Sequence, residues 1–327
     1  MTLLTRALTF GAALLLAAPA LADGPGPGGW PNKPVKIIVP FAPAGPTDVA
    51  ARLIAGKMSE NLKQQFYIEN QAGAGGNLGM GNAAKAPADG YTILFVSSSY
   101  VVNPSLYHKV PYDPAKDFVP ITKAAAAPNA LIVNPSVPAN SVKELVDLIK
   151  ADPTKFTIAS PGIGTTPHLS IELFKQAFGL NDLLVVPFNG GNPAIQAVMA
   201  GHTPLSFQAV PPATALIKDG KLRALAVTAT KRSAVLPDVP TMDELGAKGQ
   251  EAETMQGVLA PAGTPKEIVE RLQREIAAIL ATPDVRDKIV ALGFEPSGIT
   301  PAEFDAYIKA EITKWKRVIE EAKIDKI

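Results

Sequence analysis

Short apolar runs alternate along this chain with segments of helical periodicity, and this alternation limits the fold more than any other feature. Strands are predicted at Val35–Val39, Tyr67–Glu69, Thr92–Val96, Leu131–Asn134, Phe156–Ala159, Leu184–Pro187, Leu205–Gln208 and Arg223–Thr228. Several of the segments between them repeat apolar residues with the period of a helix that buries one face. The pattern is typical of an α/β protein with mainly parallel sheets.

Helix starts are marked by a hydroxyl residue with a glutamate three positions later. Ser141, Thr264 and Thr300 each open such a sequence, and Pro265 stands where the first helical residue is expected. In this capping box the hydroxyl accepts from a free backbone N–H group. Proline at the first helical position costs no hydrogen bond, because an N–H group there would have no partner within the helix. We therefore expect helices to begin directly after these three residues.

The N-terminus resembles a secretory signal. Arg6 precedes an apolar run, Leu8–Ala18, which is followed by the small-residue pattern ALA ending at Ala22. The run is too short to span a bilayer comfortably. We predict a signal peptide over residues 1–22 and a flexible leader over 23–32; an uncleaved anchor is the alternative.

Composition narrows the classes of partner. The 327 residues include no cysteine, so disulfides and thiol chemistry are excluded. Lys plus Arg number 31 against 30 acids, and loss of Arg6 with the signal leaves a formally neutral chain. Because no basic run interleaved with aromatic residues occurs, nucleic acid is not an expected partner.

The chain is long enough for two domains. Residues 121–130 and 251–260 are apolar-to-small segments that flank a central block. If both cross between domains, 131–250 forms a second lobe inserted into a first lobe made of 33–130 plus 251–327. Two such crossings would allow a hinge, with a ligand between the lobes.

Three strand–loop–helix junctions share an unusual loop composition. They span residues 35–53, 156–179 and 183–201, and their loops are rich in Gly, Pro, Ser, Thr and Asn without any basic residue. In parallel sheets, such loops lie at the carboxyl edge, where ligands bind. Helix starts offer unpaired N–H groups and partial positive charge, so the loops are suited to a carboxylate. Any α/β fold contains such turns, however, and that reading stays open.

Other polar residues near these loops have two readings each. Ser97, Ser98 and Ser99 follow a predicted strand and either add hydroxyls to the same cleft or form a serine-rich turn. Asp48 complements the helix dipole or orders a water near the ligand. Arg52 is expected as the ion-pair partner of a nearby acid.

Signals for catalysis or a cofactor are weak. Residues 73–86 contain a loose G-x-G-x-x-A pattern, but its distance from the preceding strand is wrong for a dinucleotide site, and a closely packed glycine-rich helix explains it better. The three histidines are dispersed, so neither a metal site nor a cofactor is expected. His168 and Ser160 could form a nucleophile–base pair, although a histidine bonded locally at a helix start is commoner.

Several ordered motifs resemble the Bug family of periplasmic solute receptors. They are "WPNKPVKIIVPFAPAGPTDVAARLIAGKMSENL", "IENQAGAGGNLGMGNAAKAPADGYTILF", "KLRALAVTATKRSAVLPDVPTMDELG" and "APAGTPKEIVERL". The resemblance implies a two-lobed type II periplasmic binding protein fold with a ligand cleft between the lobes. It also implies a monomer in the periplasm that delivers ligand to the integral membrane permease subunits of a tripartite tricarboxylate transporter.

In the family, the loop after the first strand and the loop before a later glycine-rich helix hold one ligand carboxylate, partly through ordered water. The matching positions here are 41–48 and 189–192, and more variable positions at 97–99 and 160–166 meet the other end. This chain departs at Ala44, where a second glycine is common, and around Phe207 and Gln208, where an acidic group is usual. The candidate ligand-binding residues are Phe41, Ala42, Pro43, Ala44, Gly45, Thr47, Asp48, Ser97, Ser98, Ser99, Ser160, Gly162, Thr165, Thr166, His168, Asn189, Gly190, Gly191, Asn192, Phe207 and Gln208.

These observations favour a non-catalytic receptor for a small organic carboxylate, with an aliphatic C4–C6 or aromatic dicarboxylate preferred. An amino acid or a neutral carboxylated aromatic is the alternative ligand. An α/β enzyme acting on a carboxylate, or a sensor that passes the liganded form to a kinase ectodomain, is the alternative function.

Overall fold

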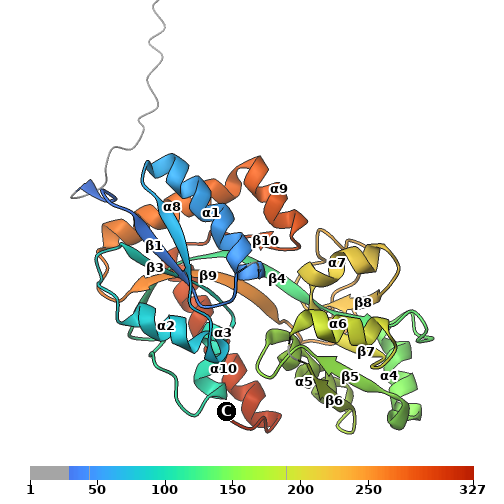
Figure 1. The fold of residues 1–327 in the computed structure, drawn as a ribbon. Helices are drawn as coiled ribbons and strands as arrows, with labels where there is room; N and C mark the ends of the chain where they lie inside the picture. Colours follow the sequence, from blue (N-terminus) through green and yellow to red (C-terminus); the bar gives the residue numbers. More distant parts are fainter. Residues whose placement is uncertain (1–28, 44, 189) are drawn as a thin grey trace, which may run out of the picture.

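A computed structural model describes residues 29–43, 45–188 and 190–327. The chain forms two α/β lobes joined by a long shared strand, as Figure 1 shows. This is the two-lobed arrangement expected from the sequence. Among the described residues, no helix combines the length and the apolar composition that crossing a membrane requires.

The first lobe contains both ends of the described chain. Its sheet has the order β2-β1-β3-β9-β4, with β10 paired to β4. Its strands are β1 (Val35–Val39), β2 (Phe66–Asn70), β3 (Thr92–Ser97), β9 (Glu253–Pro261), β10 (Glu295–Pro296) and the first part of β4 (Phe118–Val133). Its helices are α1 (Pro46–Leu62), α2 (Asn77–Ala84), α3 (Ser99–Leu106), α8 (Lys266–Ala281), α9 (Pro283–Ala291) and α10 (Pro301–Glu321), with a 3₁₀ turn η2 (Ala74–Gly76).

The second lobe is built on the end of β4. There β4 pairs with β7 and β8, and β7 continues through parallel pairing to β5 and β6. Its strands are β5 (Thr157–Ser160), β6 (Leu184–Pro187), β7 (Leu205–Ala209) and β8 (Arg223–Val227). Its helices are α4 (Val142–Ala151), α5 (Thr166–Phe178), α6 (Gly191–Met199) and α7 (Val210–Lys218), with a 3₁₀ turn η3 (Pro153–Lys155).

The strand β4 connects the lobes without a break. Its residues from Phe118 to Pro128 pair with β9, and from Asn129 to Val133 they pair with β7. The segment 121–130 therefore lies within this shared strand, and the expected strand at Leu131–Asn134 is only the end of a 16-residue strand. The first sheet is mixed, because β9 runs antiparallel to both β3 and β4.

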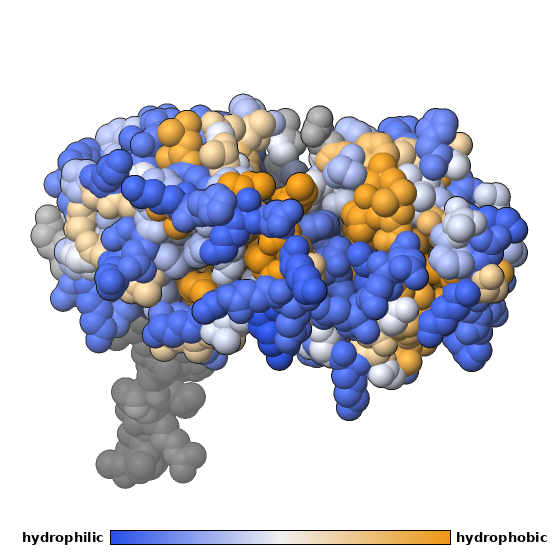
Figure 2. All heavy atoms as spheres, turned by 90° about the horizontal axis from the view of Figure 1, so that it is seen from below, coloured by the Kyte–Doolittle hydropathy of each residue, from blue (hydrophilic) through white to orange (hydrophobic). Residues whose placement is uncertain are grey.

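Buried apolar side chains form separate clusters on the two faces of each sheet. In the first lobe, α1, α8 and α9 cover one face and α2, α3 and α10 the other. In the second lobe, α4 and α5 cover one face and α6 and α7 the other. Figure 2 shows a largely hydrophilic surface, with apolar residues gathered toward the middle of the molecule.

The predicted helix starts have mixed outcomes. Ser141 caps α4 by accepting from the Glu144 N–H, and Thr300 forms a complete capping box at α10. The prediction at Thr264 is wrong: Pro265 takes the cap position of α8, and the Thr264 hydroxyl instead donates to the Pro261 carbonyl at 2.7 Å. A hydroxyl used by the preceding turn is not available to the helix.

Two further expectations concern packing. Trp30, placed by the sequence analysis in a flexible leader, is only 3% exposed and contacts Phe66 and Tyr91, so that part of the prediction is corrected. The glycine-rich helix prediction is confirmed in α2. There a Cβ at Gly79 would lie 2.8 Å from Pro40, and one at Gly81 would lie 2.6 Å from Pro111.

Candidate functional site

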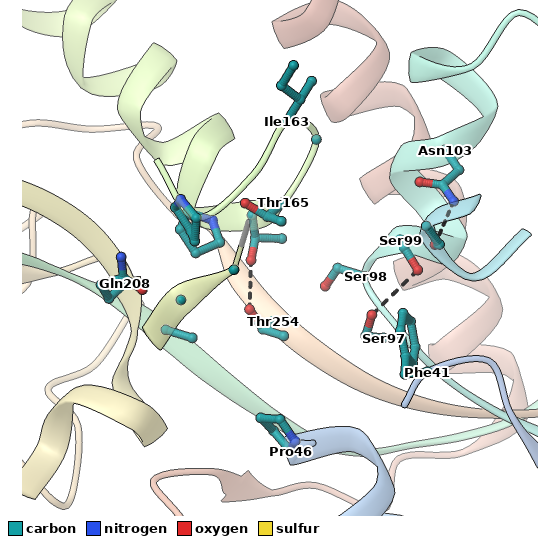
Figure 3. A pocket seen from close by; sticks show the side chains of 18 of the residues that line it. Phe41, Pro46, Ser97, Ser98, Ser99, Asn103, Ile163, Thr165, Gln208 and Thr254 are labelled. Carbon is teal, nitrogen blue, oxygen red and sulfur yellow. Dashed lines mark hydrogen bonds between the residues drawn. The ribbon is translucent and has the colours of Figure 1, made fainter. Parts of the chain in front are cut away.

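A cleft of about 480 Å³ lies between the lobes and is lined by residues of both. Figure 3 shows the lobe 1 side chains Ser97, Ser99 and Phe41 facing the lobe 2 side chains Thr165 and Gln208 across this space. The lining residues are Phe41, Pro46, Gly75, Ser97, Ser98, Ser99, Asn103, Leu106, Tyr107, Pro161, Ile163, Gly164, Thr165, Thr166, Pro167, Gly190, Gly191, Gln208, Ala209, Pro212 and Thr254.

The starts of five helices meet at this cleft. Residues at or beside the N-caps of α1, α3, α5, α6 and α7 line it: Pro46, Ser98, Ser99, Thr165, Thr166, Gly190, Gly191 and Ala209. Among these five described helix starts, only that of α5 has a side-chain cap, in which Thr165 Oγ1 accepts from the His168 N–H. Uncapped helix starts leave backbone N–H groups free and carry partial positive charge. The cleft is therefore suited to an anion.

No charged side chain or histidine occurs among the described lining residues. The described residues also contain no group of three or more acidic or histidine side chains placed to hold a metal ion. Hydrogen-bond donors in the cleft are thus neutral: backbone N–H groups, hydroxyls and amides. Burial raises the pKa of Tyr107, which keeps this lining hydroxyl protonated and able to donate.

The first turn of α1 is held by its own side chains. Asp48 is 1% exposed and accepts from Arg52 Nε at 2.9 Å and from Asn70 Nδ2 at 2.8 Å. Asn70 Nδ2 also donates to the Phe41 carbonyl at 3.1 Å, which fixes the loop after β1. The predicted ion pair of Arg52 is confirmed. Asp48 therefore supports the loop, and of this turn it is Pro46 that reaches the cleft.

The three consecutive serines after β3 divide their roles. Ser98 Oγ donates to the Glu253 carbonyl and accepts from the Met255 N–H, both at 2.9 Å, so it joins β9 to the start of α3. Ser97 Oγ and Ser99 Oγ lie 3.5 Å apart and both line the cleft. Ser97 and Ser99 are consequently the serine hydroxyls available to a ligand.

The start of α5 forms the second-lobe wall opposite α3. His168 Nδ1 accepts from the Gly164 N–H at 3.2 Å, and burial together with the charge of Lys175 lowers the pKa of His168 to about 4. Ser160 Oγ accepts from the Gly162 N–H at 3.3 Å. Since neither side chain bonds the other, His168 is the locally bonded helix-start histidine that the sequence suggested, and the pair forms no nucleophile–base arrangement.

Described residues of the two lobes also approach each other beside the cleft. Thr166 Oγ1 of α5 lies 2.7 Å from Thr254 Oγ1 of β9, and Figure 3 shows this hydrogen bond at the base of the site. A Cβ at Gly164 would lie 2.0 Å from Leu106 Cδ2, so a larger residue there would require the Leu106 side chain or the lobes to shift.

The loop before α6 presents backbone groups that carry no side chain of their own, because two glycines lead into the helix. Gly190 has φ +120°, a conformation that side chains rarely adopt, and Gly191 begins the helix with no side-chain cap. A Cβ at Gly191 would lie 3.2 Å from Gln208 Oε1, which places the amide of Gln208 against the start of this helix.

Nine of the sequence-predicted site residues line the cleft: Phe41, Ser97, Ser98, Ser99, Thr165, Thr166, Gly190, Gly191 and Gln208. The following predicted residues do not line the cleft: Ala42, Pro43, Gly45, Thr47, Asp48, Ser160, Gly162, His168 and Asn192. Phe207 is placed in the core of lobe 2, fully buried against Phe174 on the opposite face of β7. Ala44 and Asn189 lie outside the described residues.

Sequence reasoning missed the contribution of α3 and β9. Asn103 and Leu106 line the cleft from α3, Tyr107 lines it directly after this helix, and Thr254 lines it from the start of β9. Pro104 within α3 obscured the helical pattern. The burial of Phe207 could have been predicted from the sequence. Side chains alternate along β7, so Leu205 and Phe207 point to the core and Gln208 points to the other face.

Known proteins with related sequences and structures are solute-binding proteins. The "Tripartite tricarboxylate transporter family receptor" profile matches residues 50–324. Protein BugT of Bordetella pertussis is 36% identical over 94% of this chain and 93% of its own.

Solved structures agree with this relationship. An R. palustris protein with adipate has a TM-score of 0.81 at 37% identity, over 91% of this chain and all of the other (100%). MatC from Rhodopseudomonas palustris with bound malate has a TM-score of 0.76 at 32% identity, over 89% of this chain and 100% of the other. The fold is that of periplasmic binding proteins, and the resemblance to the Bug family is confirmed. This chain belongs to the tripartite tricarboxylate transporter receptor family.

Proposed function

We propose that this protein is a non-catalytic periplasmic receptor that captures a small organic dicarboxylate, an aliphatic C4–C6 or an aromatic one. The observation that carries the proposal is the convergence of uncapped helix starts on a cleft without a charged lining residue. Helix N-termini bind anions through N–H groups and their dipole, so no lysine or arginine is needed. The relatives with adipate and malate hold ligands of this class.

A dicarboxylate suits the cleft because anion-binding groups stand on both walls. The N–H groups of α6 face the cleft from lobe 2, and the start of α3 with the Ser97 and Ser99 hydroxyls faces it from lobe 1. A volume of about 480 Å³ lies within the usual range for small-molecule sites. Tricarboxylates fit less well, since a third carboxylate would have no cation to neutralise it.

The remaining assignments belong to the same proposal. Residues 1–22 serve as an export signal, and the lobes comprise 33–130 plus 251–327 and 131–250. The protein acts as a monomer, and the closed, liganded form docks on the integral membrane permease subunits of a tripartite tricarboxylate transporter. The same closed form presented to a kinase ectodomain would serve a sensor role. Gene neighbourhood and a direct binding assay with the permease distinguish the two.

A thermal-shift screen of the purified mature chain tests the proposal. Mono-, di- and tricarboxylates, amino acids and sugars are compared, and hits are confirmed by calorimetry. A ligand at about a hundred times its Kd adds about 2.7 kcal/mol to the free energy of unfolding, which a melt detects readily. A shift with a narrow set of dicarboxylates supports the proposal. A response only to amino acids or sugars, or consumption of the carboxylate, contradicts it.

A further inference from the structure

The orientation of the Gln208 amide is determined by its neighbour Ser206. The Ser206 hydroxyl lies 2.6 Å from the Ala159 carbonyl and 3.0 Å from the Phe207 carbonyl, and carbonyl oxygens can only accept. Its single hydrogen is therefore used, and the hydroxyl accepts from Gln208 at 2.8 Å. The group of Gln208 that faces Ser206 must be the donor Nε2, which leaves Oε1 at the other end.

That oxygen faces the anion-binding end of the cleft. Gln208 lines the cleft although its side chain is 1% exposed, and its Oε1 lies 3.2 Å from the position of a Cβ at Gly191. Among the described residues, the Gln208 amide bonds Ser206 through Nε2, and none donates to Oε1. An amide oxygen at the cleft wall without a protein donor can accept a hydrogen bond from a donor on the ligand. Figure 3 shows Gln208 on the opposite side of the site from Ser97 and Ser99.

The chemistry of that donor follows from the surroundings. A second carboxylate oxygen at this point would meet another acceptor and be repelled. An ammonium group would meet the positive ends of the helices and no lining carboxylate, so its charge would be poorly compensated. A neutral hydroxyl can donate to Oε1 and carries no charge, so it meets neither the repulsion nor the uncompensated charge.

We propose that Gln208 Oε1 accepts a hydrogen bond from a hydroxyl group next to the bound carboxylate, so that the preferred ligands are 2-hydroxycarboxylates. This inference rests on the proposed carboxylate-receptor function. The ligand carboxylate binds the N–H groups at the start of α6, and its neighbouring hydroxyl points to Gln208. Gln208 is then the residue that distinguishes a hydroxylated ligand from its unsubstituted parent.

Calorimetric titration with matched ligands tests this. Malate against succinate, and 2-hydroxyglutarate against glutarate, differ only by the hydroxyl. One neutral hydrogen bond predicts that the wild-type chain binds the hydroxylated member about two- to tenfold more tightly. Gln208→Met keeps the side-chain length and removes the acceptor, so the ratio should fall to about one. Gln196→Met, the same change at an exposed position of α6, should leave the ratio as in the wild type.

The outcomes separate the two proposals. If no carboxylate binds, the receptor function fails and this inference fails with it. If dicarboxylates bind but the wild-type ratio is one, or if Gln208→Met leaves the ratio unchanged, the receptor function stands and the role of Gln208 is rejected. Tighter binding of aspartate than of malate also overturns it, because that result requires an ammonium at this position. A wild-type ratio of one rejects the inference even if the variant does not fold.

Discussion

The loops after β1 and after β6 share the same sequence pattern but differ in what they offer a ligand. After β1, the loop is tied internally by Asp48 and Asn70, and it lines the cleft with Phe41 and with Pro46, which has no N–H group. After β6, Gly190 and Gly191 leave the backbone bare and α6 uncapped. Tertiary partners therefore determine whether a loop of this composition leaves its backbone N–H groups available to an anion. Lobe 2 thus holds the anion, and lobe 1 supplies hydroxyls and shape.

The largest expected effect follows from placing a charge at the start of α6. Gly191→Asp should weaken dicarboxylate binding by a hundredfold or more, since like charges about 4 Å apart repel by on the order of 4 kcal/mol near a protein surface. The melting temperature without ligand should stay close to that of the wild type, because an acid at a helix start is favourable. Calorimetry checks the affinity. Gln196→Glu adds the same charge on the exposed side of α6 and should leave it unchanged.

Acid should weaken lobe 2 through His168. Burial lowers the pKa of His168 from 6.5 to about 4, so the unfolded chain takes up this proton at a higher pH than the folded one. The stability is complete above pH 6.5 and is lost as pH falls toward 4, by about 3 kcal/mol. Denaturant unfolding across this range measures it. His168→Asn removes this titrating group, so the free energy of unfolding of the variant should depend less on pH over this range. A pH profile unchanged from that of the wild type would refute the role of His168.

Closure should depend on the glycine in the loop before α5. Gly164→Ala places a Cβ 2.0 Å from Leu106 Cδ2 across the lobe interface, which should lower ligand affinity about tenfold. Gly179→Ala is the matched control, because Gly179 has a similar positive φ and open space around it. Both variants should lose about 1 kcal/mol of stability from the backbone alone. Equal affinities in the two variants would show that the contact with Leu106 does not limit closure.

The smallest effect on ligand affinity is expected for the loop after β1, which is held by hydrogen bonds within lobe 1. Asn70→Ala removes the bonds to Asp48 and to the Phe41 carbonyl, and should cost about 1–2 kcal/mol of stability. Affinity should fall only two- to threefold, since this loop provides shape. Chemical denaturation measures the stability, and calorimetry on the same sample measures the ligand affinity. A loss of affinity as large as that of Gly191→Asp would reverse the comparison between the lobes.

Features encoded within a few residues were predictable from the sequence. The caps at Ser141 and Thr300, the starts of the loop helices and the alternation of strands and helices follow from local spacing and turn chemistry. The functional division among Ser97, Ser98 and Ser99 was not, because it depends on where β9 runs, more than 150 residues away. The burial of Asp48 against Asn70 likewise depends on tertiary structure and could not be predicted from local sequence. Local pattern located the cleft, and long-range pairing decided which groups remain free in it.

A crystal structure of the mature chain with its tightest-binding dicarboxylate would show which groups hold the ligand. We expect a ligand carboxylate within about 2.7–3.1 Å of backbone N–H groups at the start of α6, directly or through one water, and no lysine or arginine in contact with it. A carboxylate paired with a basic side chain, or bound away from the cleft between the lobes, would contradict it.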